Sequence, residues 1–306
     1  MQRETKKVTN QVMRQERALT TNDLIFKKVF ASPQNSHILT GFINDILELG
    51  ATDVTIENTY NINTFHRRNE NSEIKSTQVD VLARLEDGSQ VTIEMQVVQQ
   101  RLFRKRAFFY ATDIYRSNYD KRSLVDTKGR QTKAEKKYSS LRPVYSICIM
   151  AENEFFEDEN PIHEFRMYDV KNDIFYIDES GQDMIRITFL EIKKSSNEMR
   201  ENIKAWFEYF NTGNVTDNAP RYIQEACAIA SYKNLSSEEV SMISEMQRAI
   251  DATQDREDYV WYSGKEEGIA EGIAMLVRTL FSKGKTIEEI AGLTDMKEDE
   301  VREIVK

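Results

Sequence analysis

The order of apolar and polar residues divides the chain into a mixed first part and a helical second part. Apolar residues recur at helical spacing over residues 20–30 and 37–49, which predicts two amphipathic helices. Beyond residue 195 the pattern is helical almost to the end. Short runs rich in β-branched and aromatic residues predict strands near 53–63, 77–85, 90–98, 143–150, 165–170 and 185–192, with a helix at about 102–119. We therefore expect an α/β domain over residues 1–195 and an all-helical C-terminal region over residues 196–306.

The C-terminal region carries a pattern that allows two helix backbones to approach closely. Small and apolar residues recur there at four-residue and heptad-like intervals, namely Gly264, Gly268, Gly272, Ile269, Ile273, Leu276 and Leu280. A homodimer formed through these helices explains the pattern, and so does packing within one chain. Residues 284–306 then predict a helix-turn-helix-like hairpin. Its second helix has more acidic than basic residues, so we favour a small packing module over a sequence reader.

Residues 78–96, QVDVLARLEDGSQVTIEMQ, predict a β-hairpin because apolar and polar positions alternate on both sides of an Asp-Gly turn. A two-residue turn would mix the apolar and polar faces. A three-residue loop over residues 86–88, with Gly88 at positive φ, instead pairs apolar with apolar positions. In that register Asp80 lies directly opposite Glu94, with Cβ atoms roughly 5 Å apart. Gln96 lies on the same face.

Two opposed carboxylates on a half-buried sheet repel each other unless a cation lies between them. The chain has three scattered histidines, at positions 37, 66 and 163, and no cysteine near the hairpin. Oxygen ligands of this kind favour Mg²⁺ or Mn²⁺ over zinc. Asp80 and Glu94 therefore predict a divalent-metal site suited to phosphodiester hydrolysis. The alternative is that both are edge-strand residues that face solvent.

The charge distribution indicates one localised anion-binding surface. The chain has a net charge of −9, yet residues 99–145 hold thirteen basic residues against four acidic ones. Such a surface binds the phosphate backbone of nucleic acid, while the remaining surface repels it. For residues 120–137 alone we prefer a solvated lysine-rich loop. The candidates for nucleic-acid contact are Arg101, Arg104, Lys105, Arg106 and Tyr110.

Composition excludes several other classes of protein. A hydrophobic fraction of 40% with 30% charged residues is typical of a globular protein. Cys148 and Cys227 are far apart and form no CxxC motif, which argues against a disulfide framework and a zinc ribbon. We see neither a signal peptide nor an apolar run of about 18 residues, so we expect a cytoplasmic protein without a membrane partner.

The order of helix, Asp-bearing strand, E-x-Q strand, helix and strand resembles the PD-(D/E)XK nuclease superfamily. More narrowly, the chain resembles the PD-(D/E)XK nuclease family transposases, which are related to recombination-promoting nucleases. The combination of IEMQ and RAFFY is the most specific part of the resemblance. The matching stretches are DLIFKKVF at 23–30, FINDILEL at 42–49, VDV at 79–81, VTIEMQ at 91–96, RAFFY at 106–110, RPVYSICIM at 142–150, LEIKK near 190, and EEGIAEGI and GKTIEEIA in the C-terminal region.

The resemblance implies a restriction-endonuclease-like core with a mixed central sheet flanked by helices. It implies that Asp80 and Glu94 bind the metal, that Gln96 takes the position usually held by lysine, and that Asp23 approaches the same site. Since a glutamine amide only orients water by hydrogen bonding, the stabilising positive charge must come from the metal or from Arg106. The alternative for Asp23 is capping at its helix N-terminus.

We expect Arg106 to contact the scissile phosphate or to order Glu94, with Tyr110 one turn further along the same helix face. The alternative for Arg106 is a structural salt bridge to a core carboxylate. We expect Phe108 and Phe109 to pack in the core rather than to stack on bases.

These observations predict a metal-dependent DNA endonuclease that uses Mg²⁺ or Mn²⁺, linked to recombination, mobile elements or defence. The alternative is a catalytically weak protein with the nuclease fold that binds nucleic acid or another protein.

Overall fold

A computed structural model describes residues 20–58, 79–97, 102–119, 137–151 and 155–306 of the chain. By internal contacts the chain divides into two compact units, residues 1–243 and 244–306. Among the described helices, none is both long and apolar enough to cross a lipid bilayer.

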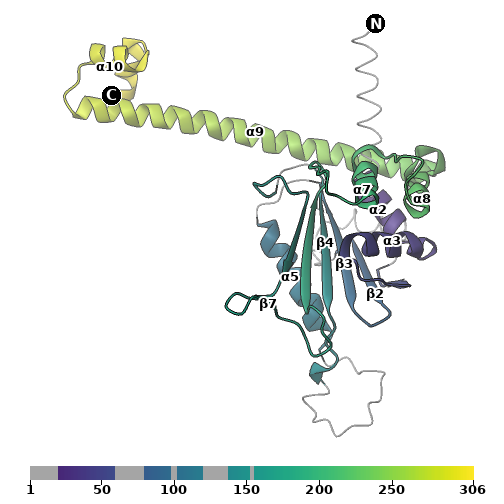
Figure 1. The fold of residues 1–306 in the computed structure, drawn as a ribbon. Coiled ribbons are helices and arrows are strands. Elements are labelled where there is room, and N and C mark those ends of the chain that lie inside the picture. The colour runs from purple at the N-terminus through teal and green to yellow at the C-terminus, as the bar shows by residue number, and fades with distance from the viewer. Residues whose placement is uncertain (1–19, 59–78, 98–101, 120–136, 152–154) are drawn as a thin grey trace. The chain divides into compact units, whose positions relative to one another are not determined.

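The first unit is built on a six-stranded mixed sheet with the strand order β1-β2-β3-β4-β8-β5 (Figure 1). The central strands β3, β4 and β8 are parallel, whereas β1, β2 and β5 pair antiparallel with their neighbours. The strands are β1 (Val54–Ile56), β2 (Val81–Leu85), β3 (Gln90–Gln96), β4 (Val144–Met150), β5 (Ile162–Arg166) and β8 (Ile185–Glu191), with a separate hairpin of β6 (Tyr168–Asp169) and β7 (Ile174–Phe175). The expected mixed sheet flanked by helices is confirmed.

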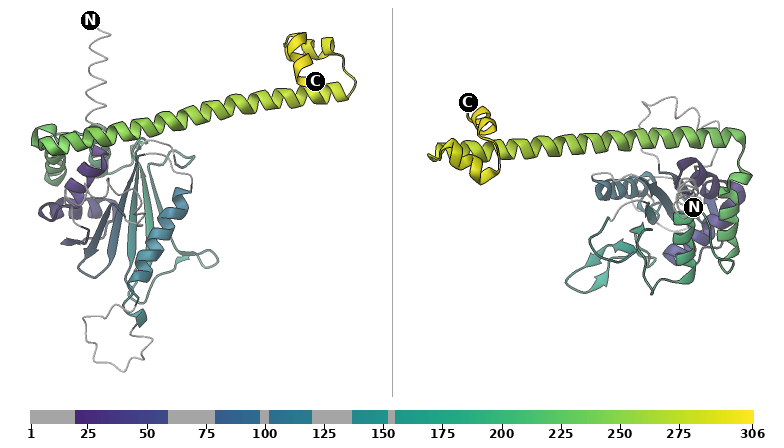
Figure 2. Two further views of the ribbon diagram at one scale, coloured as in Figure 1. Left: turned by 180° about the vertical axis from the view of Figure 1, so that it is seen from behind. Right: turned by 90° about the horizontal axis from the view of Figure 1, so that it is seen from above.

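Helices cover both sides of this sheet (Figure 2). On one side α5 (Phe103–Ser117) packs Phe103, Ala107 and Ala111 against β4 and β8. The β4 run is buried along its whole length, as its continuous apolar sequence predicts. The other helices among the described residues of this unit are α2 (Asp23–Phe30), α3 (Ser36–Leu47), α7 (Glu201–Thr212), α8 (Arg221–Ala230) and the start of α9 (Ser237–Ser282), with short 3₁₀ turns η1 (Pro33–Asn35) and η2 (Tyr232–Asn234).

An aromatic core joins α2, α3 and α7. The Phe42 ring lies 5.2 Å from Phe30 and 4.9 Å from Trp206, the second in a T-shaped arrangement. Asp45 is buried beside this core and accepts hydrogen bonds of 2.8 Å from Trp206 Nε1 and from Tyr222 Oη. Helices α7 and α8, which follow residue 195, thus pack on α3 within the first unit.

The second unit contains the rest of α9 together with α10 (Ile287–Thr294) and α11 (Glu298–Val305). Its small core holds Val277, Ile290 and Val301, one from each helix. Thr286 caps α10 in a reciprocal capping box with Glu289. The C-terminal pair α10 and α11 therefore packs back on the end of α9.

Candidate metal and nucleic-acid site

The hairpin register predicted from the sequence is confirmed. Val81 pairs with Ile93 and Ala83 with Val91, a register that, continued by one residue, places Asp80 opposite Glu94. The turn is the expected three-residue loop, since Leu85 N donates to Ser89 O at 2.8 Å and Gly88 has φ +87°. This register forms because one face of the hairpin is buried. A slip of one residue would move its apolar side chains to the opposite face.

Asp80 and Glu94 are both half-buried, with side-chain exposures of 24% and 12%. Burial, together with the charge of Asp23, raises the pKa of Asp80 to about 6. Burial, together with the charge of Asp80, raises the pKa of Glu94 to about 7, although Arg106 opposes the shift. The charge of Asp80 therefore disfavours the charged form of Glu94, whereas the like charge that acts on Asp80 is that of Asp23.

Lys27 of α2 lies between two of the predicted acidic residues. Its Nζ is 2.6 Å from Asp23 Oδ1 and 3.5 Å from Asp80 Oδ1. Asn22 is the N-cap of α2, and its side chain accepts from Leu24 N at 3.1 Å, while Asp23 follows it in the first turn of the helix. Sequence reasoning missed Lys27, although its position four residues after Asp23 on a helix is a signal for such a pair.

Arg106 of α5 connects to the E-x-Q strand mainly through Gln96. Its Nη2 donates to Gln96 Oε1 at 2.7 Å and lies 3.9 Å from Glu94 Oε2. The guanidinium also lies over the Phe103 and Tyr110 rings, with Cζ 4.7 Å and 5.9 Å from their centroids. Arg106 thus fixes the orientation of the Gln96 amide and adds positive charge beside Glu94.

The donor set of this site suits a hard divalent cation. Glu94 Oε2 is buried and accepts no hydrogen bond, since Arg106 Nη2 at 3.9 Å is beyond hydrogen-bond distance, and a carboxylate oxygen left in this way is costly. Mg²⁺ in proteins is commonly held by only one or two carboxylates and keeps several waters. Asp80 and Glu94 can supply that minimum. Among the described residues, no group of three or more His, Cys, Asp or Glu side chains is arranged to hold an ion.

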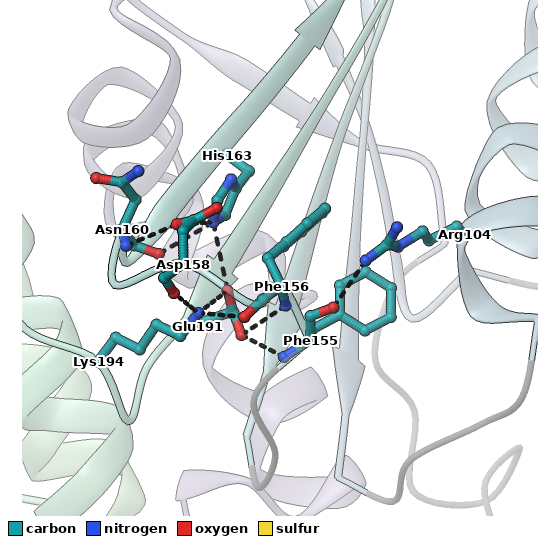
Figure 3. Close-up of polar contacts among 8 residues, drawn as sticks. All are labelled: Arg104, Phe155, Phe156, Asp158, Asn160, His163, Glu191 and Lys194. Carbon is teal, nitrogen blue, oxygen red and sulfur yellow. Dashed lines mark hydrogen bonds and ion pairs between the residues drawn. The ribbon is translucent and has the colours of Figure 1, made fainter.

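The predicted nucleic-acid contacts lie at or near the start of α5. Lys105 is exposed and Tyr110 is half-buried, whereas Arg101 lies outside the described residues. Arg104 Nη2 donates to Phe155 O at 2.8 Å, and its guanidinium stacks over the Phe156 ring at 4.4 Å (Figure 3). Arg104 is therefore held against the segment that follows β4.

Glu191 at the end of β8 anchors that same segment (Figure 3). Its side chain is 1% exposed, forms a 2.8 Å ion pair with Lys194, lies 3.4 Å from His163 Nε2, and accepts a hydrogen bond from Phe156 N at 3.3 Å. The parallel register aligns Glu191 with Met150 and Gln96 at one edge of the sheet. Glu191 thus fixes the segment that Arg104 contacts. In the sequence, Glu191 was visible only as part of the LEIKK stretch.

The expectation that Phe108 and Phe109 pack in the core is wrong. Their side chains are 58% and 55% exposed. The face of α5 that meets the sheet is formed by Phe103, Ala107 and Ala111, at intervals of four residues. Residues 108 and 109 are rotated about 100° and 200° from residue 107, so they point away from it.

A sequence model of the PD-(D/E)XK nuclease family transposases matches residues 20–261. No curated protein and no solved structure matches the chain.

Proposed function

We propose that this chain, which belongs to the PD-(D/E)XK nuclease family transposases, is a metal-dependent endonuclease that hydrolyses phosphodiester bonds in DNA. The observation that carries the proposal is the pair of half-buried carboxylates on one sheet face, one of which has a buried oxygen that accepts no hydrogen bond. Burial, with a neighbouring carboxylate, raises the pKa of both carboxyl groups, so their ionised forms are costly and a bound cation would favour them. Recombination, mobile-element maintenance and defence, in the cytoplasm, are the roles that we propose for such an activity.

The residues have separate roles in the proposed reaction. Asp80 and Glu94 would hold Mg²⁺ or Mn²⁺, and Asp23 is joined to the same site by Lys27, whose Nζ contacts both Asp23 and Asp80. When bound, the cation polarises water and neutralises charge on the phosphate. Gln96, fixed by Arg106, orients the attacking water by hydrogen bonding.

Two cationic side chains compensate for the missing lysine at position 96. Lys27 approaches from α2 and Arg106 from α5, so positive charge reaches the site from two elements. Electrostatic stabilisation of a transition state needs such charges to be held in place before the reaction. The ion pair of Lys27 and the hydrogen bond of Arg106 hold them.

Supercoiled plasmid provides the direct test. We expect the full-length protein to nick it with Mg²⁺ or Mn²⁺ and to stop when EDTA is added. Asp80→Asn and Glu94→Gln should each reduce the rate at least about 100-fold, because each removes a ligand charge. Glu267→Gln, an exposed change in the second unit, is the matched control and should cut normally. Cleavage that persists in Glu94→Gln or in EDTA would contradict the proposal.

The alternative is a protein with the nuclease fold that binds nucleic acid, or another protein, without cutting. The position of Lys27 Nζ, 3.5 Å from Asp80 Oδ1, favours it, because an ammonium group there compensates for a carboxylate without a metal. Thermal unfolding with added Mg²⁺ or Mn²⁺ separates the two functions. A catalytic site is stabilised by mass action as the metal concentration rises, so the melting temperature of the wild type should rise with the metal while that of Glu94→Gln stays unchanged. A wild-type melting temperature that does not change with metal concentration supports the alternative.

We also propose a homodimer formed through α9. In the second unit Ile269, Ile273 and Leu276 are 54%, 39% and 50% exposed. They lie beside Gly268 and Gly272, where an added Cβ would meet no atom within 4 Å. Light scattering should give twice the mass of one chain for the wild type and a single mass for Ile269→Glu. A monomeric wild type would contradict this part.

A further inference from the structure

Helix α5 presents an exposed aromatic and basic surface, which we call the α5 aromatic face and define as Lys105, Phe108 and Phe109. The two phenylalanine side chains are 58% and 55% exposed, and Lys105, one turn before Phe109, is exposed as well. Adjacent phenylalanines that leave this much ring surface in water are disfavoured in a chain that acts alone. They therefore indicate a surface that another molecule covers.

This face is continuous with the candidate site. The Phe109 ring centroid lies 6.0 Å from that of Tyr110. The Tyr110 ring in turn lies 5.9 Å from Cζ of Arg106, whose Nη2 donates to Gln96. Flat aromatic and guanidinium surfaces thus run from the E-x-Q strand to the outer side of α5. A strand of nucleic acid with its phosphate at Asp80 and Glu94 would pass these rings.

Charge selects the class of molecule that covers the face. Residues 99–145, which include α5, hold thirteen basic and four acidic residues in a chain of net charge −9. On the helix itself Arg116 Nη2 pairs with Asp113 Oδ1 at 2.9 Å, which neutralises the one acidic residue of α5. A polyanion is therefore favoured over a basic or purely apolar protein surface.

We propose that the α5 aromatic face stacks the unpaired bases of single-stranded or locally melted DNA beside the cleavage site. The inference rests on the proposed function and names its substrate class. In a duplex each base face is covered by its neighbours, so an exposed side chain on a helix reaches a base face only where the strand is unpaired. Base stacking on aromatic rings tolerates any sequence, because every base has a π-face.

Binding of two matched oligonucleotides tests the inference. The full-length protein carries Glu94→Gln so that no strand is cut, and fluorescence anisotropy compares a 20-nucleotide single strand with the duplex of the same sequence. Phe108→Leu and Phe109→Leu should each weaken single-strand binding about 5- to 100-fold and leave duplex binding within about twofold, as the typical loss per stacked base implies. Phe109→Trp, which keeps a ring, should restore the binding.

The control is Tyr259→Leu, which removes a 74% exposed aromatic ring from the second unit. It should bind both DNA forms as the parent does. As a direct readout of stacking, the fluorescence of a 2-aminopurine placed in the single strand should fall when the parent binds. The fall should be absent with Phe108→Leu and Phe109→Leu combined.

The outcomes separate this inference from the nuclease proposal. Unchanged binding by both leucine variants, or equal weakening of single-strand and duplex binding, overturns the inference while plasmid nicking still decides the function. Failure of the wild type to cut any DNA removes the nuclease, whereas a ring-dependent preference for single strands still supports the stacking face. A change of oligomeric state in the leucine variants with unchanged DNA binding shows a protein contact and overturns the inference.

Discussion

Replacement of Glu94 by glutamine should change how the stability of the protein depends on pH. In the folded state the pKa of Glu94 is raised from 4.5 to about 7, chiefly by burial and then by the charge of Asp80. The folded protein therefore keeps a proton on this group in a pH range where the unfolded chain has lost it. By linkage, the free energy of unfolding falls as pH rises from about 4.5 to about 7.

The size of this effect follows from the pKa difference. One unit of pKa corresponds to about 1.4 kcal/mol. Part of the Glu94 shift takes effect below about pH 5 and is therefore not included in the comparison below. Between about pH 5 and about pH 8 the wild type should lose about 2–3 kcal/mol of stability through Glu94 alone. Glu94→Gln has no proton to lose at this position. Its free energy of unfolding should therefore not show this part of the decrease with pH.

Urea denaturation in EDTA, followed by circular dichroism at both pH values, measures the difference. Glu267→Gln serves as the control for a general change of charge and should follow the wild type. Mg²⁺ added at about pH 8 should recover part of the loss in the wild type and none in Glu94→Gln.

Two results would refute this reasoning. If wild type and Glu94→Gln lose stability in parallel between the two pH values, the Glu94 carboxyl group is not buried beside the Asp80 carboxylate. If Mg²⁺ stabilises both proteins equally, the cation binds elsewhere. The first result concerns the proton on Glu94 and the second concerns the cation, so each can occur without the other.

Substitutions at three further positions test other parts of the structure. Lys27→Met should reduce plasmid nicking at least about tenfold while Lys27→Arg retains more activity, because a cation 3.5 Å from Asp80 Oδ1 then remains; equal loss in both variants would contradict a role for the charge. Asp45→Ala should lower the free energy of unfolding by about 2–4 kcal/mol in urea titrations, because it leaves Trp206 Nε1 and the Tyr222 hydroxyl without their acceptor. A loss below about 1 kcal/mol would show that these hydrogen bonds contribute little to stability. Gly88→Ala should cost about 1 kcal/mol or more in the same assay, because a side chain is strained at φ +87° and meets Arg142 Nε at 3.0 Å; unchanged stability would mean that the loop relaxes.

Much of the site could be read from the sequence, because strand alternation and turn chemistry are local properties. The apolar face of the hairpin allowed one register, and Gly88 supplied the positive φ that its loop needs. That register alone brought Asp80 opposite Glu94. The helical spacing of α2, α3 and α5 was equally visible, since each helix buries one stripe.

Contacts between distant segments could not be read in this way. Lys27 and Asp80 are separated by a stretch that includes α3 and β1, so nothing in the local pattern joins them. The bond from Arg106 to Gln96, in place of a close pair with Glu94, likewise depends on how α5 lies on the sheet.

The choice of the buried face of α5 shows what the sequence determines and what the tertiary structure determines. RAFFY offers apolar residues on neighbouring faces, so the sequence by itself determined that a helix forms there and left open which face is buried. Packing decided in favour of Phe103, Ala107 and Ala111, because small residues let the helix backbone approach β4 and β8. Phe108 and Phe109 were thereby left in solvent. Local pattern thus determined the elements and the carboxylate pair, whereas the docking of helices on the sheet decided which cations and rings surround it.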